Sequence, residues 1–333
     1  MGGATTSYND AMHMRPFGRT GLTVSEMGYG LWGMGGWTGS DDAESIAALH
    51  RSIDLGCTFF DTALAYGDGK SERLLGQVLP SHRDKPLVVG TKVPPKNGKW
   101  PARPEYALSD VFPVDWVIQC TETSLKNLDV ERLDVQQLHV WTDEWAEQDE
   151  WMEAIQTLKK SGKVRAFGIS INRWDPTNII DALCTGLVDS VQVVHNIFDQ
   201  HPEDILFPLC QEMGVAIIAR VPLDEGSLTG TLTKDTRWPE GDFRNIYFPP
   251  DKLAAAVDRV ERLKTEVPGG MTLPDMALRF ILSHPAVSTV IPGMRKIRHV
   301  EANMACGDGQ GLPADLVSRL RPYRWNRGYP VEK

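Results

Sequence analysis

The chain has 333 residues, of which 41% are hydrophobic and 24% are charged, and its formal net charge at pH 7 is −9. These fractions are typical of a globular protein that can bury a sizeable core without disulfides or metal ions. The acidic balance argues against nucleic acid and against a membrane surface as the main partner, because binding phosphate groups takes a basic face.

Five cysteines lie far apart in the sequence, and no C-x-x-C pair occurs among them. This odd count and the lack of a secretory leader favour reduced thiols and a cytoplasmic location. No apolar run approaches the roughly 18 to 20 residues that a membrane span requires, and no cluster of His, Cys and Asp has the spacing of metal ligands. We expect a polar, flexible tail over residues 1–13 and a single domain over residues 14–333.

Along the chain, short apolar runs alternate with longer amphipathic stretches. A glycine-flanked pattern over Arg15–Ser25 predicts a β-hairpin ahead of them. Runs rich in Val, Ile and Phe predict eight strands buried on both faces, namely Met27–Trp32, Cys57–Asp61, Leu87–Thr91, Val135–Trp141, Val164–Ser170, Ser190–Val194, Val215–Arg220 and Val287–Ile291. Amphipathic stretches with helix caps predict helices at Asp41–Leu55, Asp115–Leu128, Ala146–Lys160, Asp175–Leu183 and Pro250–Lys264.

Strand–helix alternation repeated about eight times predicts an α/β fold with parallel strands, and this number favours a closed (β/α)8 TIM barrel over an open sheet. No G-x-G-x-x-G follows an early strand, which removes the main support for an open dinucleotide-binding fold. The spacing of Gly33-Met34-Gly35-Gly36 is wrong for that motif and fits a loop. We expect long loops at the C-terminal face of the barrel, and Asp224–Pro250 has the length of a flap over a ligand.

Four side chains of complementary chemistry come at or just after the ends of consecutive predicted strands, where this fold gathers its active site. They are Asp61, Tyr66, Lys92 and His139. Reducing a carbonyl group by hydride transfer needs a proton donor, and a nearby lysine would lower the pKa of a tyrosine. Asp61 would hold the lysine charged, and His139 would donate to the developing alkoxide. Each residue alone has an ordinary structural explanation, but the four together favour a catalytic site.

The sequence around these positions resembles the aldo-keto reductase superfamily, in particular its bacterial members and the related branch of potassium-channel β-subunits. The resemblance covers about Arg15 to Asn303, and its clearest motifs are Asp61-Thr62-Ala63-x-x-Tyr66-Gly67, Gly162-Lys163-Val164-Arg165-x-Phe167-Gly168-Ile169-Ser170, Ser227-Leu228-Thr229-Gly230 and Ile291-Pro292-Gly293. It implies a TIM barrel that moves a hydride between NADP(H) and a carbonyl or alcohol. By this resemblance Tyr66 is the general acid/base, Lys92 and Asp61 tune it, and His139 orients the substrate carbonyl.

The resemblance also implies a set of cofactor-binding residues: Trp32, Asp61, Ser170, Gln192, Arg220, Pro222, Leu223, Leu228, Gly293, Arg295, His299 and Asn303. Two positions at the nicotinamide end depart from the family pattern. Ile171 stands where Asn is commonest, and Asn172 comes one residue late. Arg220 stands where an aromatic ring often lies against the nicotinamide. Its guanidinium could stack there, or it could turn towards Asp224 and Glu225 as a loop clamp.

A basic run, Gly293-Met294-Arg295-Lys296-Ile297-Arg298-His299, opens the predicted last helix of the barrel. Cations at a helix start oppose the helix dipole, and an adenosine 2′-phosphate bound by Arg295 would explain them. We therefore expect NADPH rather than NADH as cofactor, with a solvated basic patch as the alternative. His299 and Ala302 depart from the family pattern, while Asn303 keeps it.

Trp32 and Trp141 come at predicted strand ends, so we expect them to line a substrate pocket with Tyr66 and His139. The expected function is NADPH-dependent reduction of small-molecule aldehydes and ketones to alcohols. Two alternatives stay open: an NADP(H)-binding sensor that acts through a protein partner, and an NAD(P)-dependent sugar or alcohol dehydrogenase. The sequence selects neither a substrate nor an oligomeric state.

Overall fold

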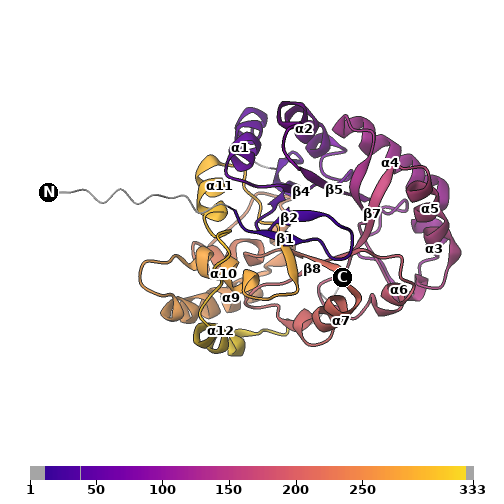
Figure 1. The fold of residues 1–333 in the computed structure, drawn as a ribbon. Helices are drawn as coiled ribbons and strands as arrows, with labels where there is room; N and C mark the ends of the chain where they lie inside the picture. Colours follow the sequence, from indigo (N-terminus) through magenta and orange to yellow (C-terminus); the bar gives the residue numbers. More distant parts are fainter. Residues whose placement is uncertain (1–11, 38, 328–333) are drawn as a thin grey trace.

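The computed structural model describes residues 12–37 and 39–327. Its centre is a barrel of eight parallel strands with helices around the outside (Figure 1). The strands are neighbours in chain order, and they are β3 (Tyr29–Gly30), β4 (Phe59–Asp61), β5 (Val88–Val93), β6 (Leu133–Leu138), β7 (Val164–Ser170), β8 (Ser190–Val194), β9 (Ala216–Arg220) and β10 (Val287–Val290). The predicted (β/α)8 architecture is confirmed.

The barrel closes where β10 returns to β3. Isolated parallel bridges join Met27 to Val290 and Gly30 to Gly293. The amide of Gly30 also donates to the carbonyl oxygen of Pro292 at 3.0 Å. A Cβ on Gly30 would lie 2.7 Å from the carbonyl oxygen of Ile291, so this seam leaves no room for a side chain there. Closing the sheet pairs both edges that an open sheet would leave exposed.

A hairpin of β1 (Met14–Pro16) and β2 (Thr23–Ser25) lies across one end of the barrel, as Figure 1 shows. Phe17 packs on Phe59, the first residue of β4, with ring centroids 5.5 Å apart. It shares a buried cluster with Val88 and Ala216, which begin β5 and β9. The hairpin therefore covers the N-terminal ends of the strands and leaves the C-terminal ends for a site, as in other barrels of this type.

The helices around the barrel bury apolar faces against the strands in one continuous core. They are α1 (Asp42–Asp54), α2 (Lys70–Val78), α4 (Val114–Leu128), α5 (Asp149–Lys160), α6 (Ile180–Cys184), α7 (Leu206–Met213), α9 (Pro250–Leu263), α10 (Leu273–Leu282), α11 (Ile297–Met304) and α12 (Ala314–Leu320). Short turns α3 (Leu108–Val111) and α8 (Arg244–Tyr247) lie in the loops. The 3-10 turns used below are η1 (Trp32–Met34), η5 (Asp224–Thr229) and η7 (Arg321–Tyr323).

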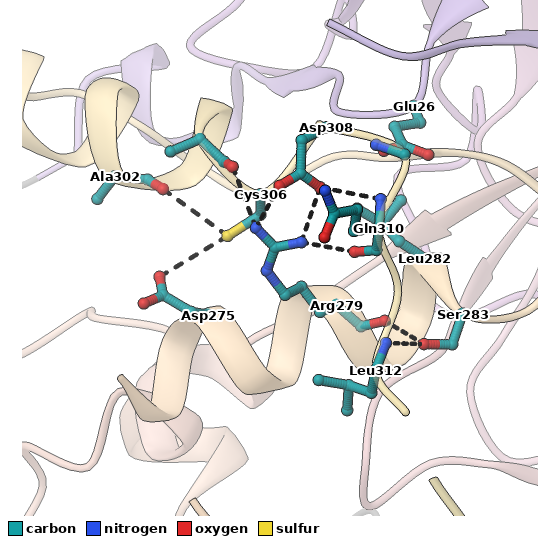
Figure 2. Close-up of polar contacts among 12 residues, drawn as sticks. Glu26, Asp275, Arg279, Leu282, Ser283, Ala302, Cys306, Asp308, Gln310 and Leu312 are labelled. Carbon is teal, nitrogen blue, oxygen red and sulfur yellow. Dashed lines mark hydrogen bonds and ion pairs between the residues drawn. The ribbon is translucent and has the colours of Figure 1, made fainter. Parts of the chain in front are cut away.

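Figure 2 shows how α10 fastens the chain that follows α11. Arg279 on α10 pairs with both carboxylate oxygens of Asp308 at 2.8 Å, and it also donates to the carbonyl oxygens of Ala305 and Gln310. Glu26, just before β3, accepts from the amide of Gly309 at 2.8 Å. These bonds fix the C-terminal end of α11, the helix that carries two predicted cofactor residues.

Most predicted elements match the structure to within a few residues, with two differences. Asp175–Leu183 forms only the five-residue α6, because the carboxylate of Asp175 accepts from the amide and hydroxyl of Thr177 and forms a turn instead. The basic run does not open its helix at Gly293, since α11 begins at Ile297. The predicted tail falls mostly on residues 1–11, which lie outside the described residues; His13 donates to the carbonyl oxygen of Gly307 at 2.8 Å.

Candidate active site

The four predicted catalytic residues meet at the C-terminal ends of three adjacent strands. Asp61 ends β4, Lys92 is the fifth residue of β5, and His139 directly follows β6. Tyr66 lies in the turn between β4 and α2. That turn packs closely on η1: Gly67 has a φ of 63°, and a Cβ there would lie 2.4 Å from the carbonyl oxygen of Gly35. Only glycine meets both conditions without strain.

The Lys92 ammonium connects Asp61 to Tyr66. Its Nζ donates to Asp61 Oδ2 at 2.6 Å, to the carbonyl oxygen of Thr62 at 2.8 Å and to Tyr66 Oη at 3.3 Å. Lys92 is fully buried, and Asp61 is 2% exposed. A buried ammonium with all three protons engaged is held as a fixed charge beside the phenol.

Two glutamine side chains hold Asp61 from the other side. Its Oδ1 accepts from Gln192 Nε2 at 2.7 Å and from Gln137 Nε2 at 3.1 Å. Gln192 was predicted as a cofactor residue, and here its amide nitrogen is bound to Asp61. Gln137 was not predicted, although two consecutive glutamines in the buried strand β6 are a signal for polar partners inside the barrel.

The protonation states follow from burial and from these charges. Burial lowers the pKa of Lys92, but Asp61 and Tyr66 outweigh it, so the net direction is upward and the ammonium stays charged. Burial raises the pKa of Tyr66 above its usual value of 10.0, against the lowering effects of Lys92 and Arg220. The predicted lowering effect of Lys92 on the Tyr66 pKa is present, but desolvation of the phenolate is larger and the net direction is upward. Burial, Lys92 and Arg220 all lower the pKa of His139, so its imidazole is neutral at pH 7.

Aromatic rings surround Tyr66 and His139. The rings of Tyr66 and His139 meet edge to face with centroids 5.5 Å apart, and Trp100 meets His139 at 4.6 Å. Trp100, which was not predicted, is 47% exposed. Trp32 is 36% exposed and contacts Phe243 at 5.5 Å, which brings the segment after η5 across to η1.

Trp141 does not lie with these rings. It is 1% exposed and packs edge to face against Trp145 and Trp151, with ring centroids 5.8 Å and 5.3 Å away. Its Nε1 donates to Asp143 at 3.2 Å. The structure thus places Trp141 in the core, against Trp151 of α5, and it does not support the predicted role in the pocket.

At the neighbouring strand ends, Ser170 and Gln192 are paired residues of β7 and β8. Arg220 ends β9, and its Nη2 donates to the carbonyl oxygen of Ile171 at 2.9 Å. Its Nε is buried and has no hydrogen-bond partner in the described part of the chain. Asn172 does not replace the missing family asparagine, since its Oδ1 accepts from the amide of Asp175. The cluster can therefore offer a cofactor the Arg220 guanidinium in place of an asparagine amide.

After β9 the chain carries the predicted cofactor residues Pro222, Leu223 and Leu228 through a tight turn. Asp224 and Glu225 have φ values of 49° and 51°, in the left-handed region that non-glycine residues seldom adopt. Burial, followed by Asp224, raises the pKa of Glu225 to about 7. Both explanations for Arg220 stay open, because its hydrogen bond goes to Ile171 while its charge also lowers the pKa of Glu225.

The basic residues of the last barrel unit lie near η1 and α11. The side chain of Arg295 packs over Gly33, where an added Cβ would lie 3.1 Å from Arg295 Cδ. His299, in the first turn of α11, is exposed, while Asn303 is 7% exposed. Arg295 and Gly293 thus precede the helix, on the seam between β10 and β3.

Two features are absent from the part of the chain that the structure describes. Over residues 12–37 and 39–327, no group of three or more His, Cys, Asp or Glu side chains could hold a metal ion. Within the same ranges, no helix combines the length and the apolar character that crossing a membrane requires.

The sequence matches the Aldo/keto reductase family over residues 26–321, and the chain belongs to that family. It is 29% identical over 297 residues to aldo-keto reductase YhdN of Bacillus subtilis, covering 85% of each chain. It is 28% identical over 305 residues to an NADH-specific methylglyoxal reductase of Escherichia coli, covering 87% of this chain and 92% of the relative. The predicted family is confirmed.

Solved structures agree with this assignment. An aldo-keto reductase of Bacillus halodurans in its holo form superposes with a TM-score of 0.75 at 27% identity, covering 96% of this chain and 98% of that one. An aldo-keto reductase of Klebsiella pneumoniae in complex with NADPH superposes with a TM-score of 0.69 at 26% identity, covering 95% and 97%. The protein is therefore a (β/α)8 barrel of an oxidoreductase family, and the candidate site lies at the C-terminal ends of its strands.

Proposed function

We propose that this protein is an NADPH-dependent reductase of small aldehydes and ketones, with Tyr66 as the proton donor. The observation that carries the proposal is the chain of contacts from Asp61 through the Lys92 ammonium to Tyr66 Oη, with the His139 ring against Tyr66. A phenol, a buried ammonium and a neutral imidazole at one rim are what carbonyl reduction requires from a protein.

Each side chain has a distinct task in this reaction. A substrate carbonyl placed between Tyr66 and His139 would accept hydrogen bonds from both, which polarises it before reduction. Tyr66 then gives its proton to the carbonyl oxygen as that oxygen becomes an alkoxide, and the Lys92 ammonium at 3.3 Å stabilises the resulting phenolate. Asp61 and its two glutamine partners keep that ammonium in place. Bound NADPH would supply the hydride.

The residues present fit such a cofactor at its nicotinamide end. Ser170 is adjacent to Gln192 across two strand ends, and Arg220 has a buried Nε with no partner in the described chain. A polar group of the cofactor would satisfy this atom, whose burial otherwise costs free energy. NADPH in the Klebsiella relative supports the same cofactor here.

The choice of NADPH over NADH rests on Arg295 and the basic residues after it. A guanidinium recognises a phosphate through paired hydrogen bonds, and the 2′-phosphate distinguishes the two cofactors. Because the Escherichia coli relative is NADH-specific, NADH is the alternative cofactor that the experiment has to exclude. We expect NADPH to quench tryptophan fluorescence with a low Kd and NADH to quench it with a much higher Kd. Arg295→Ala should reduce this preference, whereas Arg165→Ala, at an exposed position at the N-terminal end of β7, should leave it unchanged.

Turnover tests the catalytic part of the proposal. Tyr66→Phe should bind NADPH as the wild type does and lose carbonyl reduction by about 10²- to 10⁴-fold, the usual contribution of a positioned acid. Tyr323→Phe, which removes a hydroxyl near the surface, is the matched control. Wild-type rates in Tyr66→Phe would exclude Tyr66 as the proton donor. A failure of the wild type to bind either cofactor would refute the function itself.

A further inference from the structure

The last described residues of the chain run back over the loops of the candidate site. We call residues 324–327, which follow η7, the C-terminal strap. The amide of Trp325 donates to the carbonyl oxygen of Phe198 at 2.8 Å, and Arg324 pairs with Asp204 at 2.8 Å. The strap thus lies against the segment that follows β8, and it reaches the turn that follows β9 through Arg327.

Arg327 makes the strap's only ion pair with that turn among the described residues. Its Nη1 lies 2.7 Å from Asp224 Oδ1, and its side chain is 5% exposed against 0% for Asp224. Tyr247 of α8 also donates to Asp224 Oδ1 at 2.7 Å, and Ser227 donates to Asp224 Oδ2. Asp199 lies 3.8 Å from Arg327 Nη2. A fully buried carboxylate is therefore balanced by a cation from the far end of the chain.

Asp224 lies in a turn with an unusual backbone conformation, and its carboxylate accepts a hydrogen bond from Ser227 of the same turn. Four residues of this turn have positive φ, from Val221 at 54° to Gly226 at 102°, and three of them are not glycine. Such backbone persists only where surrounding contacts determine it. Without Arg327 the buried Asp224 carboxylate loses its nearest counter-charge. An unpaired buried charge is costly in free energy, and opening of the turn towards water would reduce that cost.

The same contacts reach the mouth of the barrel. Tyr247 bonds to Asp224, and Arg173, on the loop after β7, lies over the Tyr247 ring at 4.8 Å. Phe243, just before α8, contacts Trp32 of η1. A displacement of Asp224 would therefore be passed to the segment that crosses from η5 to η1, which covers one side of the mouth.

We propose that Arg327 is a positioning residue for cofactor binding: through Asp224 it holds η5 and α8 in the conformation that retains NADPH. This proposal rests on the proposed function, because Leu223 and Leu228 in and beside η5 are expected to contact the cofactor. Arg327 itself touches neither substrate nor reacting atoms. Arg327 should therefore slow the dissociation of NADPH and leave the rates of hydride and proton transfer unchanged.

The experiment compares the full-length wild type with Arg327→Ala, Arg327→Lys and Arg324→Ala by stopped-flow measurement of NADPH dissociation. Arg327 acts only through the turn that is expected to cover the cofactor, and most changes in affinity appear in the dissociation rate, so Arg327→Ala should release NADPH about tenfold faster or more. Its KM for NADPH should rise, while kcat at saturating NADPH does not fall. Arg327→Lys keeps the charge and should restore most of the difference. Arg324→Ala removes an exposed ion pair of the same strap and should behave as wild type.

Each outcome decides the question. An unchanged dissociation rate in folded Arg327→Ala, or an equal acceleration in Arg324→Ala, overturns the proposal, since the contact with Asp224 would then not matter. If Arg327→Ala does not fold, Arg327→Gln decides, because it keeps much of the side-chain length and removes the charge that faces Asp224. Normal dissociation from folded Arg327→Gln would also overturn it. A wild type that binds no NADPH refutes the proposed function, whereas a wild type that binds it beside an unaffected Arg327→Ala refutes this inference alone.

Discussion

Arg220 and Ile171, the two departures from the family pattern at the nicotinamide end, are in direct contact. Arg220 Nη2 donates to the carbonyl oxygen of Ile171 at 2.9 Å. The guanidinium therefore lies over the end of β7, beside the position where the family most often has an asparagine. The two changes make sense together: an apolar residue at 171 removes a polar side chain, and the arginine brings donors to the same place.

This contact predicts that Arg220 strengthens cofactor binding and favours the reduced form. A fixed cation beside the nicotinamide repels the positive ring of NADP+ more than the neutral ring of NADPH. Arg220→Ala should weaken NADPH binding by about tenfold, as expected for a charged hydrogen-bond donor, and should bring the affinities for NADPH and NADP+ closer together. Fluorescence titration with each cofactor measures both effects.

Arg220→Lys and Arg165→Ala are the controls for that measurement. The lysine keeps the charge without the planar fork, so it should preserve the preference for NADPH better than it preserves the affinity. Arg165 is exposed at the other end of β7 and should matter for neither. An unchanged ratio of the two affinities in Arg220→Ala would show that the guanidinium does not lie near the nicotinamide.

The buried pair of Lys92 and Asp61 should separate stability from catalysis. Lys92→Met leaves Asp61 buried without its cation, which should cost about 3–5 kcal/mol in the free energy of unfolding. Adding Asp61→Asn removes the unpaired charge, so the double variant should recover much of that loss. Carbonyl reduction should stay about 10²-fold or more below wild type in both, because Tyr66 has lost its ammonium in each.

Urea unfolding and turnover of the wild type, the single variant and the double variant give the required comparison. Both substitutions, Lys92→Met and Asp61→Asn, nearly preserve side-chain volume, so they leave no large cavity. Recovery of activity together with stability in the double variant would contradict the role assigned to Lys92, since a purely structural pair would behave in that way.

The barrel and the positions of the four candidate residues at its rim could be predicted because both depend on local sequence. Alternating strand and helix patterns define the parallel sheet, and the end of each strand then fixes where Asp61, Lys92 and His139 lie. The helix α10 was missed although Thr272 and Asp275 form a capping box. The buried residues Leu273, Met276, Ala277, Phe280 and Ile281 also have helical spacing, so the sequence carried both signals for this helix.

Contacts between distant loops could not be predicted in the same way. Trp100 reaches His139 from the long loop after β5, and Arg327 reaches Asp224 from the end of the chain. No spacing rule relates residues so far apart, because the path of each loop depends on packing. The lowering effect of Lys92 on the Tyr66 pKa was predicted, but the larger opposing effect of burial was not, since burial depends on the whole rim and not on the adjacent lysine.

That pKa shift predicts the pH dependence of carbonyl reduction. Tyr66 must be protonated to act as an acid, and burial raises its pKa above 10.0, so the acid form persists to at least that pH. The pKa of His139 lies well below 6.5, mainly through burial, so the imidazole stays neutral over the same range. Single-turnover reduction with saturating NADPH should therefore be flat from pH 6.5 through neutral pH, and any alkaline decline should have its midpoint above pH 10.0. A decline centred below pH 10.0 would mean that another group limits the reaction.

Glu225 should make the stability of the protein depend on pH. Burial and Asp224 raise its pKa from 4.5 to about 7, so ionisation opposes the folded state. The wild type should lose stability as pH rises from about 4.5 to about 7 and should lose no more from this group above that. Glu225→Gln removes the ionisation and should gain on the order of 1–3 kcal/mol in the free energy of unfolding at pH 8, a range reduced for partial solvent screening. At pH 4.5 the gain should nearly vanish.

Urea unfolding of both proteins at the two pH values tests this expectation, and Glu240→Gln in the exposed part of the same loop is the control. An equal gain at both pH values would point to packing or hydrogen bonding of the glutamine instead of the lost charge.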